Sequence, residues 1–378
     1  MRILFACGGT AGHINPAIAI ADTLRADNAG VQVLFAGNPN GMEATLVPKA
    51  GYDFVPIEVD GLQRKLSWTN IKRNARAAAR LAGAGKKAHR IIKDFAPDIV
   101  MGTGGYVSAP VVYKAAQMGI KTLTHEQNAF PGLTTKFLCR RVDKVLLAVA
   151  AAKAHLPAEK NYIVTGNPIR TDILFADRAA ARAKLGIGGR VCVLSYGGSL
   201  GAQQINEAMA EVIATLLPEQ RTHHIHATGR YGTEQFPLWL RERGIDPDTQ
   251  DHLDVREYID DMPDCLAAAD LVICRSGAIS LSELEAAGKA SILVPSPNVA
   301  ENHQYHNAMV LANKNAAIVV EEKDLTGSAL AALVRDLVSD PQELLNLGKN
   351  AASLAVIDAN RRICSEILSL YAQPSAKS

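Results

Sequence analysis

A histidine follows a run of small residues near the start of the chain, in the order Gly8, Gly9, Thr10, Ala11, Gly12, His13. Glycines between a strand and a helix let backbone N–H groups approach an anion, and the N-terminus of the next helix favours negative charge. Histidine is also the residue type that takes a proton from a hydroxyl near neutral pH. The run therefore predicts either an anion-binding turn that carries a general base, or a structural turn with a surface histidine.

Two more glycine loops follow apolar runs that read as strands. Gly102–Ser108, which contains Gly104, Gly105 and Tyr106, comes after Ile99–Met101, and Gly197–Gly201 comes after Val191–Tyr196. The two loops of the first half could bracket a single diphosphate, and the loop of the second half opens a domain of its own. A packing turn is the alternative for each loop taken alone.

Other polar groups follow strand-like runs. His125-Glu126-Gln127-Asn128 is costly to bury without hydrogen bonds, which favours a polar site, and His125 with Glu126 offers general-base chemistry. Glu283 lies one turn into a predicted helix after Cys274–Ala278, where it could accept both hydroxyls of a ribose or complement the helix dipole. The polar run 300–308 could line a sugar or be a solvated helix N-terminus.

Metal chemistry has weak support. His224 and His226 share a strand face without a neighbouring acidic or cysteine cluster, and Asp246-Pro247-Asp248 reads as a surface turn. The six cysteines are scattered without zinc spacing, which favours a reduced, cytosolic setting. We predict no metal and no cofactor.

One segment is strongly basic although the net charge of the chain is only +2. Between Asp60 and Asp94 there is no acidic residue, and the basic residues of Arg64–Lys93 accompany Leu66, Trp68, Ile71 and Leu81. Basic charge around apolar anchors is typical of docking on anionic lipid. A solvated helix and an RNA patch are the alternatives; stacking aromatics are sparse, so we expect no nucleic acid partner. No apolar run is long enough for a membrane span.

Strand-like and helix-like runs alternate through the whole chain, which predicts mainly parallel sheets with helices on both faces. Strands are expected over runs such as Phe54–Val59, Asp98–Met101, Val191–Tyr196 and Leu271–Cys274, and Asn15-Pro16 predicts a helix start. The fold class is therefore α/β, with two Rossmann-like doubly wound domains facing across a cleft. We expect domains over residues 1–167 and 168–350, and a last segment, 351–378, that packs back on the first domain.

In this combination the motifs resemble glycosyltransferase family 28, the inverting enzymes of peptidoglycan precursor synthesis. The segments that carry the resemblance span almost the whole chain in order: Gly8–Pro16, Gly41–Glu43 with Leu46–Pro48, Gly102–Ser108, His125–Asn128, Gly166–Arg170, Gly197–Ala202, Tyr258–Met262, Arg275–Glu283 and Gln304–Ala308. The resemblance implies the two-domain glycosyltransferase B fold. It also implies transfer of N-acetylglucosamine from its UDP donor to the muramoyl 4-hydroxyl of undecaprenyl-diphosphoryl-N-acetylmuramoyl-pentapeptide.

By the same resemblance, residues spread over both domains would contact the UDP-sugar: Thr10, Ala11, Gly12, Asn128, Arg170, Ser199, Ile259, Ala278, Ile279, Ser280, Leu281, Ser282, Glu283 and Gln304. Gly8, Gly9, Gly104, Gly105 and Tyr106 would face the diphosphate of the acceptor. His13 is the first candidate for the general base, and Glu126, paired with His125, is the second. Ala11 stands where the family usually has a third glycine, and we expect only a local adjustment there.

The resemblance further implies a peripheral location at the cytoplasmic face of the membrane, with cell-wall synthesis proteins as partners. Another enzyme on the same fold, such as a glycolipid glycosyltransferase or a UDP-sugar epimerase, is the nearest alternative. A non-catalytic subunit that binds UDP-sugars is the alternative of a different class.

Overall fold

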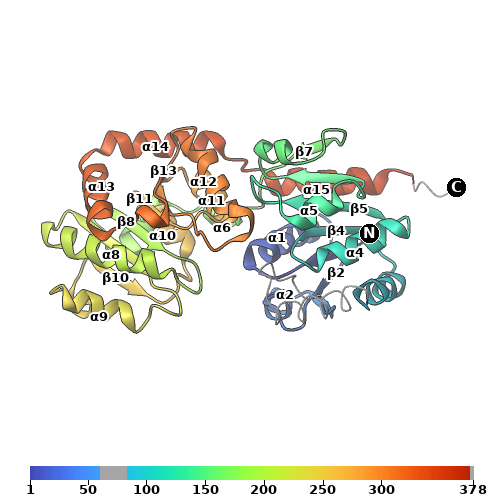
Figure 1. Ribbon diagram of the computed structural model, residues 1–378, viewed down its shortest axis with the longest axis horizontal. Helices are drawn as coiled ribbons and strands as arrows, with labels where there is room; N and C mark the ends of the chain where they lie inside the picture. The colour runs from blue at the N-terminus through green and yellow to red at the C-terminus, as the bar shows by residue number, and fades with distance from the viewer. Residues whose placement is uncertain (60–82, 375–378) are drawn as a thin grey trace. The chain divides into compact units, whose positions relative to one another are not determined.

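The computed structural model describes residues 1–59 and 83–374. The chain forms two compact units, one comprising Met1–Pro168 with Asp358–Ser378 and the other Ile169–Ile357 (Figure 1). The expected boundaries lay at residues 167/168 and 350/351. The second unit instead keeps helix α14 (Pro341–Leu354), and the chain returns to the first unit at Asp358.

The described part of the first unit is built on a parallel sheet with strand order β3-β2-β1-β4-β5-β6-β7. The strands are β1 (Arg2–Cys7), β2 (Gln32–Gly37), β3 (Asp53–Pro56), β4 (Ile99–Gly104), β5 (Lys121–Glu126), β6 (Lys144–Leu147) and β7 (Tyr162–Val164). The helices are α1 (Ala11–Asp27), α2 (Glu43–Lys49), α4 (Ser108–Gln117), α5 (Leu133–Leu138), α15 (Ala359–Ala372) and helical residues 83–95, with a 3₁₀ turn η1 (Ala150–His155).

Alternation along β1 separates the core of this unit into two layers, because successive side chains of a strand point to opposite faces. Ile3, Phe5 and Cys7 pack with α1 and α15, whereas Leu4 and Ala6 pack with α4 and α5. Helix α15, far along the chain, therefore completes the core of the first unit beside α1 (Figure 1).

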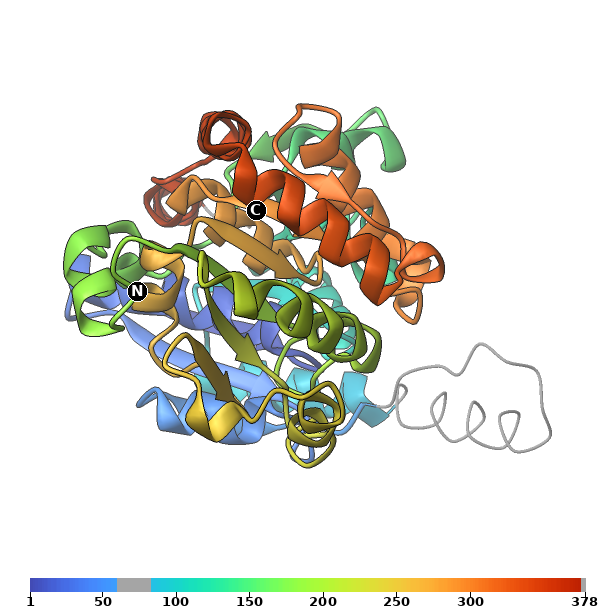
Figure 2. The ribbon, with the colours of Figure 1, turned by 90° about the vertical axis from the view of Figure 1, so that its left-hand side faces the viewer.

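The described second unit repeats the design with strand order β10-β9-β8-β11-β12-β13, all parallel. Helices flank its strands on both sides (Figures 1 and 2). The strands are β8 (Val191–Tyr196), β9 (Thr222–Ala227), β10 (Leu253–Arg256), β11 (Leu271–Cys274), β12 (Ala290–Leu293) and β13 (Ile318–Val319). The helices besides α14 are α6 (Thr171–Leu174), α7 (Arg178–Lys184), α8 (Gln203–Leu216), α9 (Gln235–Glu242), α10 (Met262–Ala268), α11 (Ala278–Ala287), α12 (His303–Ala312) and α13 (Gly327–Ser339), with 3₁₀ turns η2 (Leu217–Glu219), η3 (Pro247–Thr249), η4 (Ala300–Asn302) and η5 (Glu322–Asp324).

Two local expectations differ from the structure. Helix α1 begins at Ala11, four residues before Asn15, with Thr10 as the extended residue ahead of it, so Pro16 lies inside the helix. Strand β4 runs on to Gly104, so Gly102 and Thr103 belong to the strand rather than to a loop. The first correction matters for chemistry, because it places His13 in the rigid first turn of a helix.

Candidate active site

The two glycine loops of the first unit meet where the strand order reverses. The chain proceeds from β1 outward to β3 and then returns to β4 beside β1, and in such sheets ligands bind beyond the carboxyl ends of the strands at this point. Gly105 has φ +80°, and a Cβ atom there would lie 2.2 Å from the Gly8 carbonyl oxygen. The close approach of the two backbones therefore requires glycine at this position.

Side-chain hydroxyls tie the second loop to the first. The Ser108 hydroxyl donates to the Ala6 carbonyl at 2.6 Å and accepts the Gly104 N–H at 3.1 Å. The Thr103 hydroxyl donates to the carbonyl of His13 at 2.7 Å. Neither residue was singled out from the sequence, because each bond spans about ninety residues or more.

His13 is held on one side by the first loop and on the other by Gly104. Its Nδ1 atom lies 3.1 Å from the Gly8 carbonyl oxygen. The Thr10 hydroxyl, which can donate or accept, lies 3.4 Å from the same atom. A carbonyl only accepts, so the shorter contact favours the tautomer with the proton on Nδ1 and, in the neutral ring, the lone pair on Nε2. A Cβ atom on Gly104 would lie 2.5 Å from Cδ2 of the ring, so only glycine leaves room for this ring position.

Two of the loop amides are already used within the protein. The Gly9 N–H donates to Oε2 of Glu43 at 3.2 Å, and the Gly104 N–H donates to Ser108. Tyr106 is half exposed, and Ala11 adopts ordinary helical backbone geometry in place of the usual third glycine. An acceptor diphosphate would therefore be bound by other groups of these loops than the N–H groups of Gly9 and Gly104.

Glu126 is buried and saturated with hydrogen bonds. Its Oε1 atom accepts the backbone N–H and the side-chain amide of Asn128, both at 3.0 Å. Its Oε2 atom accepts the Gly132 N–H at 3.0 Å and the Thr135 hydroxyl at 2.5 Å. Four donors on one carboxylate make Glu126 a clamp for the loop after β5, and as a base it would first have to give up some of these bonds.

His125 is not paired with Glu126, because neighbours on a strand point to opposite faces. Its Nε2 atom lies 3.0 Å from the Gly166 carbonyl oxygen and its Nδ1 atom 3.0 Å from the amide of Gln127. The ring is fully buried, and this burial lowers its pKa. Both ring nitrogens thus form hydrogen bonds within the protein at the end of β5, so neither faces an open site.

In the second unit, Glu283 and Arg170 lie close enough to influence each other. Burial raises the pKa of Glu283 to about 7, and the nearby Arg170 partly opposes that rise. Arg170 itself donates to both carboxylate oxygens of Asp172, at 3.1 and 2.5 Å, and this contact raises its pKa. Glu283 is thus a mostly buried acid in α11 that can accept hydroxyl donors once it is ionised.

The other predicted donor residues are divided between the two units. Thr10, Ala11 and Gly12 lie at the start of α1 and Asn128 follows β5 in the first unit, and the rest lie in loops and helices of the second unit. Ser199 lies in the turn closed by a bond from the Gly201 N–H to the Gly198 carbonyl at 2.9 Å, just before α8. Residues Ala278, Ile279, Ser280, Leu281 and Ser282 form the first half of α11. Gln304 accepts the Ser296 N–H at 2.9 Å, and Ile259 is buried after β10.

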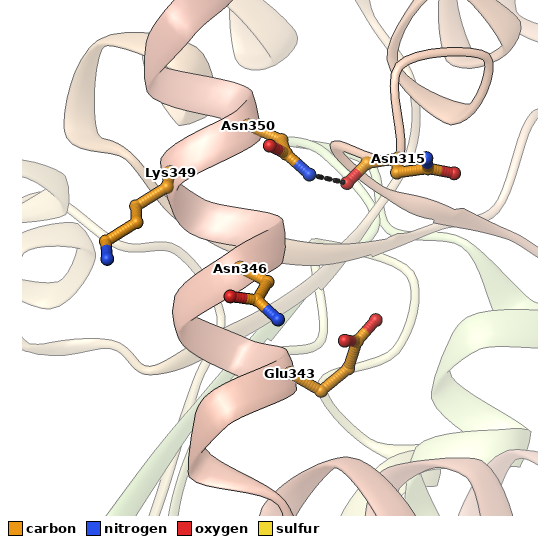
Figure 3. Close-up of a pocket in the computed structure, with 5 residues that line it drawn as sticks. All are labelled: Asn315, Glu343, Asn346, Lys349 and Asn350. Atoms are coloured by element: carbon orange, nitrogen blue, oxygen red, sulfur yellow. Dashed lines mark hydrogen bonds between the residues drawn. The ribbon is translucent and has the colours of Figure 1, made fainter.

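A shallow hollow elsewhere in the second unit contains none of these residues. It has a volume of about 410 Å³ and is lined by Asn315, Glu343, Asn346, Lys349 and Asn350 (Figure 3). The Asn350 amide donates to the Asn315 carbonyl at 2.8 Å across it. Its polar, exposed lining gives no candidate for catalysis.

Among the described residues no cluster of three or more His, Cys, Asp or Glu side chains could hold a metal ion. Asp246 and Asp248 both pair with Arg241 in an exposed turn. His224 and His226 lie buried in β9, bonded to Thr222 and Ser195.

Residues 60–82 of the basic segment lie outside the described part of the chain, whereas residues 83–93 lie on the helix that ends at residue 95. A second apolar and basic surface is described in the same unit. Leu133 and Phe137 are 56% and 41% exposed, and the Arg141 guanidinium lies 4.4 Å from the Phe137 ring. With the exposed Arg140 and the half-buried Lys136, these residues form what we name the α5 patch. Within the described residues no helix is long and apolar enough to cross a membrane.

Comparison with known proteins bears directly on this arrangement. Residues 3–147 match the glycosyltransferase family 28 N-terminal domain, and residues 191–363 match the glycosyltransferase family 28 C-terminal domain. The chain belongs to glycosyltransferase family 28. The family 28 resemblance, the glycosyltransferase class and the two-domain α/β fold expected from the motifs are thereby confirmed.

Individual relatives agree with this membership of family 28. A protein of Desulforamulus reducens named UDP-N-acetylglucosamine--N-acetylmuramyl-(pentapeptide) pyrophosphoryl-undecaprenol N-acetylglucosamine transferase is 41% identical over 94% of both chains. The crystal structure of Acinetobacter baumannii MurG superposes with a TM-score of 0.78 at 28% identity, covering 97% of this chain and 99% of that one. A putative UDP-N-acetylglucosamine 2-epimerase from Listeria monocytogenes, with a TM-score of 0.67 at 13% identity over 97% and 96%, shares the fold alone.

Proposed function

We propose that this family 28 chain transfers N-acetylglucosamine from UDP-N-acetylglucosamine to the muramoyl 4-hydroxyl of an undecaprenyl-diphosphoryl-N-acetylmuramoyl-pentapeptide acceptor. The observation that carries the proposal is the full-length similarity to relatives that bear this name, 41% identical over 94% of the chain. The geometry around His13 supports a base-assisted transfer, whereas the fold alone would equally accommodate an epimerase.

The donor is assigned to the second unit with contributions from the first. Ionised Glu283 would accept the two ribose hydroxyls, and the backbone at Ile259 would meet the uracil edge. The turn Gly197–Gly201 leads into α8, whose first N–H groups have no side-chain cap, so the helix N-terminus can receive the donor diphosphate. Thr10, Ala11, Gly12, Asn128, Arg170, Ser199, residues 278–282 and Gln304 complete the proposed donor set.

The chemical step needs one proton acceptor and one electrostatic partner for the leaving group. The acceptor hydroxyl would attack the anomeric carbon while Nε2 of His13 takes its proton, and UDP would depart from the opposite face with inversion. The N-terminus of α8 and Arg170 would stabilise the charge on the departing diphosphate. Among the candidate bases, His13 is favoured because the hydrogen bonds of Glu126 and His125 are already used for packing.

The acceptor diphosphate is assigned to the loops that carry Gly8, Gly9, Gly104, Gly105 and Tyr106. Its lipid tail requires that the enzyme work at a membrane surface, so we propose peripheral binding to anionic lipid through the Arg64–Lys93 segment at the cytoplasmic face. The α5 patch adds described support, since its apolar side chains are flanked by cations.

The test is transfer with purified protein, UDP-N-acetylglucosamine and a short-chain lipid-linked acceptor, followed by UDP release and mass of the product. We expect UDP release that depends on the acceptor, and activity that survives EDTA. Conversion of the donor to another UDP-sugar without acceptor would instead identify an epimerase. A loss of activity with EDTA that Mg²⁺ restores would contradict the metal-free step.

The base is tested by substitution. His13→Ala should lower kcat by roughly 100- to 10,000-fold, the usual contribution of a general base, while UDP binding stays intact. His155→Ala removes an exposed histidine of the same unit, outside the proposed docking segment, and serves as the control. Unchanged transfer in both His13→Ala and Glu126→Ala would refute the assignment of the base. A wild-type protein that binds UDP but transfers no sugar would instead point to a non-catalytic subunit.

Membrane docking is tested separately by sedimentation with vesicles of phosphatidylglycerol and phosphatidylcholine. Charge reversal at Arg140 and Arg141 should weaken binding, whereas Lys323→Glu, 69% exposed in the second unit, should not. Equal sedimentation of both variants would remove the α5 patch from the proposal.

A further inference from the structure

A carboxylate that sequence reasoning left without a role lies beneath the first glycine loop. Glu43, at the start of α2, is only 1% exposed. A Cβ atom on Gly8 or Gly41 would lie 2.2 or 2.3 Å from its carboxylate oxygens, and one on Gly37 would lie 2.4 Å from its Cγ atom. Three glycines thus leave the space that this single side chain fills.

The carboxylate makes two hydrogen bonds to backbone N–H groups. Oε1 accepts the Asn38 N–H at 2.9 Å, and Oε2 accepts the Gly9 N–H at 3.2 Å. Burial and the charge of Glu43 together raise the pKa of the neighbouring Cys7 thiol, which therefore stays protonated beside it. A buried carboxylate bonded in this way holds these two N–H groups in place.

One of these bonds reaches His13 through a single peptide group. The N–H of Gly9 and the C=O of Gly8 belong to the same planar trans peptide, so they point in opposite directions. The N–H points to Glu43, and the C=O points to Nδ1 of His13 at 3.1 Å. The carboxylate and the imidazole are thus connected by two hydrogen bonds at opposite ends of one peptide.

We propose that Glu43 is a positioning residue, which fixes the Gly8–Gly9 peptide and through it holds His13 in the tautomer that has its lone pair on Nε2. Two neighbouring glycines, one of them with φ +88°, give this peptide little intrinsic resistance to a flip. A flip would remove the acceptor from Nδ1 and turn a carbonyl oxygen toward the Glu43 carboxylate. Glu43 opposes that flip because its carboxylate accepts the Gly9 N–H.

The tautomer of His13 is the direct readout, and it does not depend on the proposed function. The ring can be observed by NMR of protein labelled with ¹⁵N histidine, with the His13 signals assigned by their loss in His13→Gln. In the wild-type protein we expect the proton on Nδ1. A wild-type ring protonated on Nε2 would overturn the proposal without any variant at position 43.

Two substitutions separate charge from reach. Glu43→Gln keeps the size of the side chain but offers an NH₂ group to one of the two N–H donors, and Glu43→Asp keeps the charge but is one methylene short. Both should move His13 toward the Nε2–H form that free imidazole favours. Asp53→Asn removes a carboxylate from the exposed start of neighbouring β3 and should leave the ring as in the wild type.

The kinetic consequence rests on the proposed function. Loss of a charged hydrogen bond corresponds to a roughly 10- to 100-fold lower kcat, with the KM for UDP-N-acetylglucosamine within about twofold of the wild type because most donor residues lie in the other unit. A lower melting temperature with an unchanged tautomer and kcat would show a merely structural role and refute the proposal. If the wild-type protein transfers no sugar, the proposed function fails, and the tautomer still decides the role of Glu43.

Discussion

The contact between Gly104 and His13 gives the sharpest test of the proposed base. In Gly104→Ala the added Cβ atom would lie 2.5 Å from Cδ2 and 2.9 Å from Nε2 of His13. Ordinary contacts between such atoms begin near ~3.5 Å. The imidazole must therefore move by about 1 Å, or the β4 end must move away from α1.

A displacement of this size has a known kinetic scale. Misplacement of a reacting group by about 1 Å costs on the order of 100-fold in rate. The change also places an alanine at φ +114°, a backbone strain of roughly 1–3 kcal/mol. We therefore expect kcat to fall about 100-fold and the melting temperature to fall moderately.

Gly51→Ala is the matched control for backbone strain. Gly51 has φ +80°, and a Cβ atom there would meet nothing within 4 Å. It should lose stability without losing kcat, which separates strain from ring displacement. If Gly104→Ala instead raises the KM of the acceptor and keeps kcat, the loop binds the diphosphate and the reasoning about the His13 ring is refuted.

Three further predictions concern buried ionisable groups. Burial lowers the pKa of His224 and His226 to about 3, so the unfolded chain binds more protons than the folded one below pH ~6.5, and the free energy of unfolding should fall by up to about 1.4 kcal/mol per pH unit for each ring. In the double variant His224→Gln, His226→Asn, the free energy of unfolding measured with urea should depend less on pH between about pH 6.5 and 5. The same pH dependence in the variant and the wild type would refute this. Glu283, with a pKa of about 7, must ionise to accept ribose hydroxyls, so calorimetric affinity for UDP should weaken as the pH falls below that value, in the wild type but not in Glu283→Gln. Glu126→Gln should destabilise the first unit by roughly 2–4 kcal/mol, because it disturbs the four hydrogen bonds of the carboxylate. Its kcat should fall less than that of His13→Ala. A larger fall of kcat in Glu126→Gln than in His13→Ala would make Glu126 the base.

Apolar runs predicted the strands closely because burial on both faces leaves a continuous signal. Val191–Tyr196 and Leu271–Cys274 match β8 and β11, and all strand pairs of the described sheets are parallel as expected. The start of α1 was misplaced because Thr10 precedes the helix without a side-chain cap, whereas Asn15-Pro16 imitates a start inside it. A capping motif in the sequence locates the start of a helix only where its side chain makes the capping hydrogen bond, and at α1 none does.

The polar residues were harder to interpret for the same reason. His125 and Glu126 read as an open polar site, yet their partners come from loops up to 41 residues away and leave them buried. Glu43 stood within a recognised motif without a role, because its bond to Gly9 spans 34 residues. Sequence reasoning finds such groups but cannot tell whether their hydrogen bonds end on the protein or on a ligand.

Glycine loops give a backbone the freedom to approach a ligand, and that freedom must be restrained for chemistry to be reproducible. In the first unit the restraint comes from buried side chains: Glu43 on the Gly8–Gly9 peptide, Ser108 on Gly104, and Glu126 on the loop after β5. In the mechanism with His13 as the base, none of these side chains touches the reacting atoms. Substitutions at side chains that contact only the loops should therefore displace His13. They should lower kcat and leave the KM for the donor nearly constant.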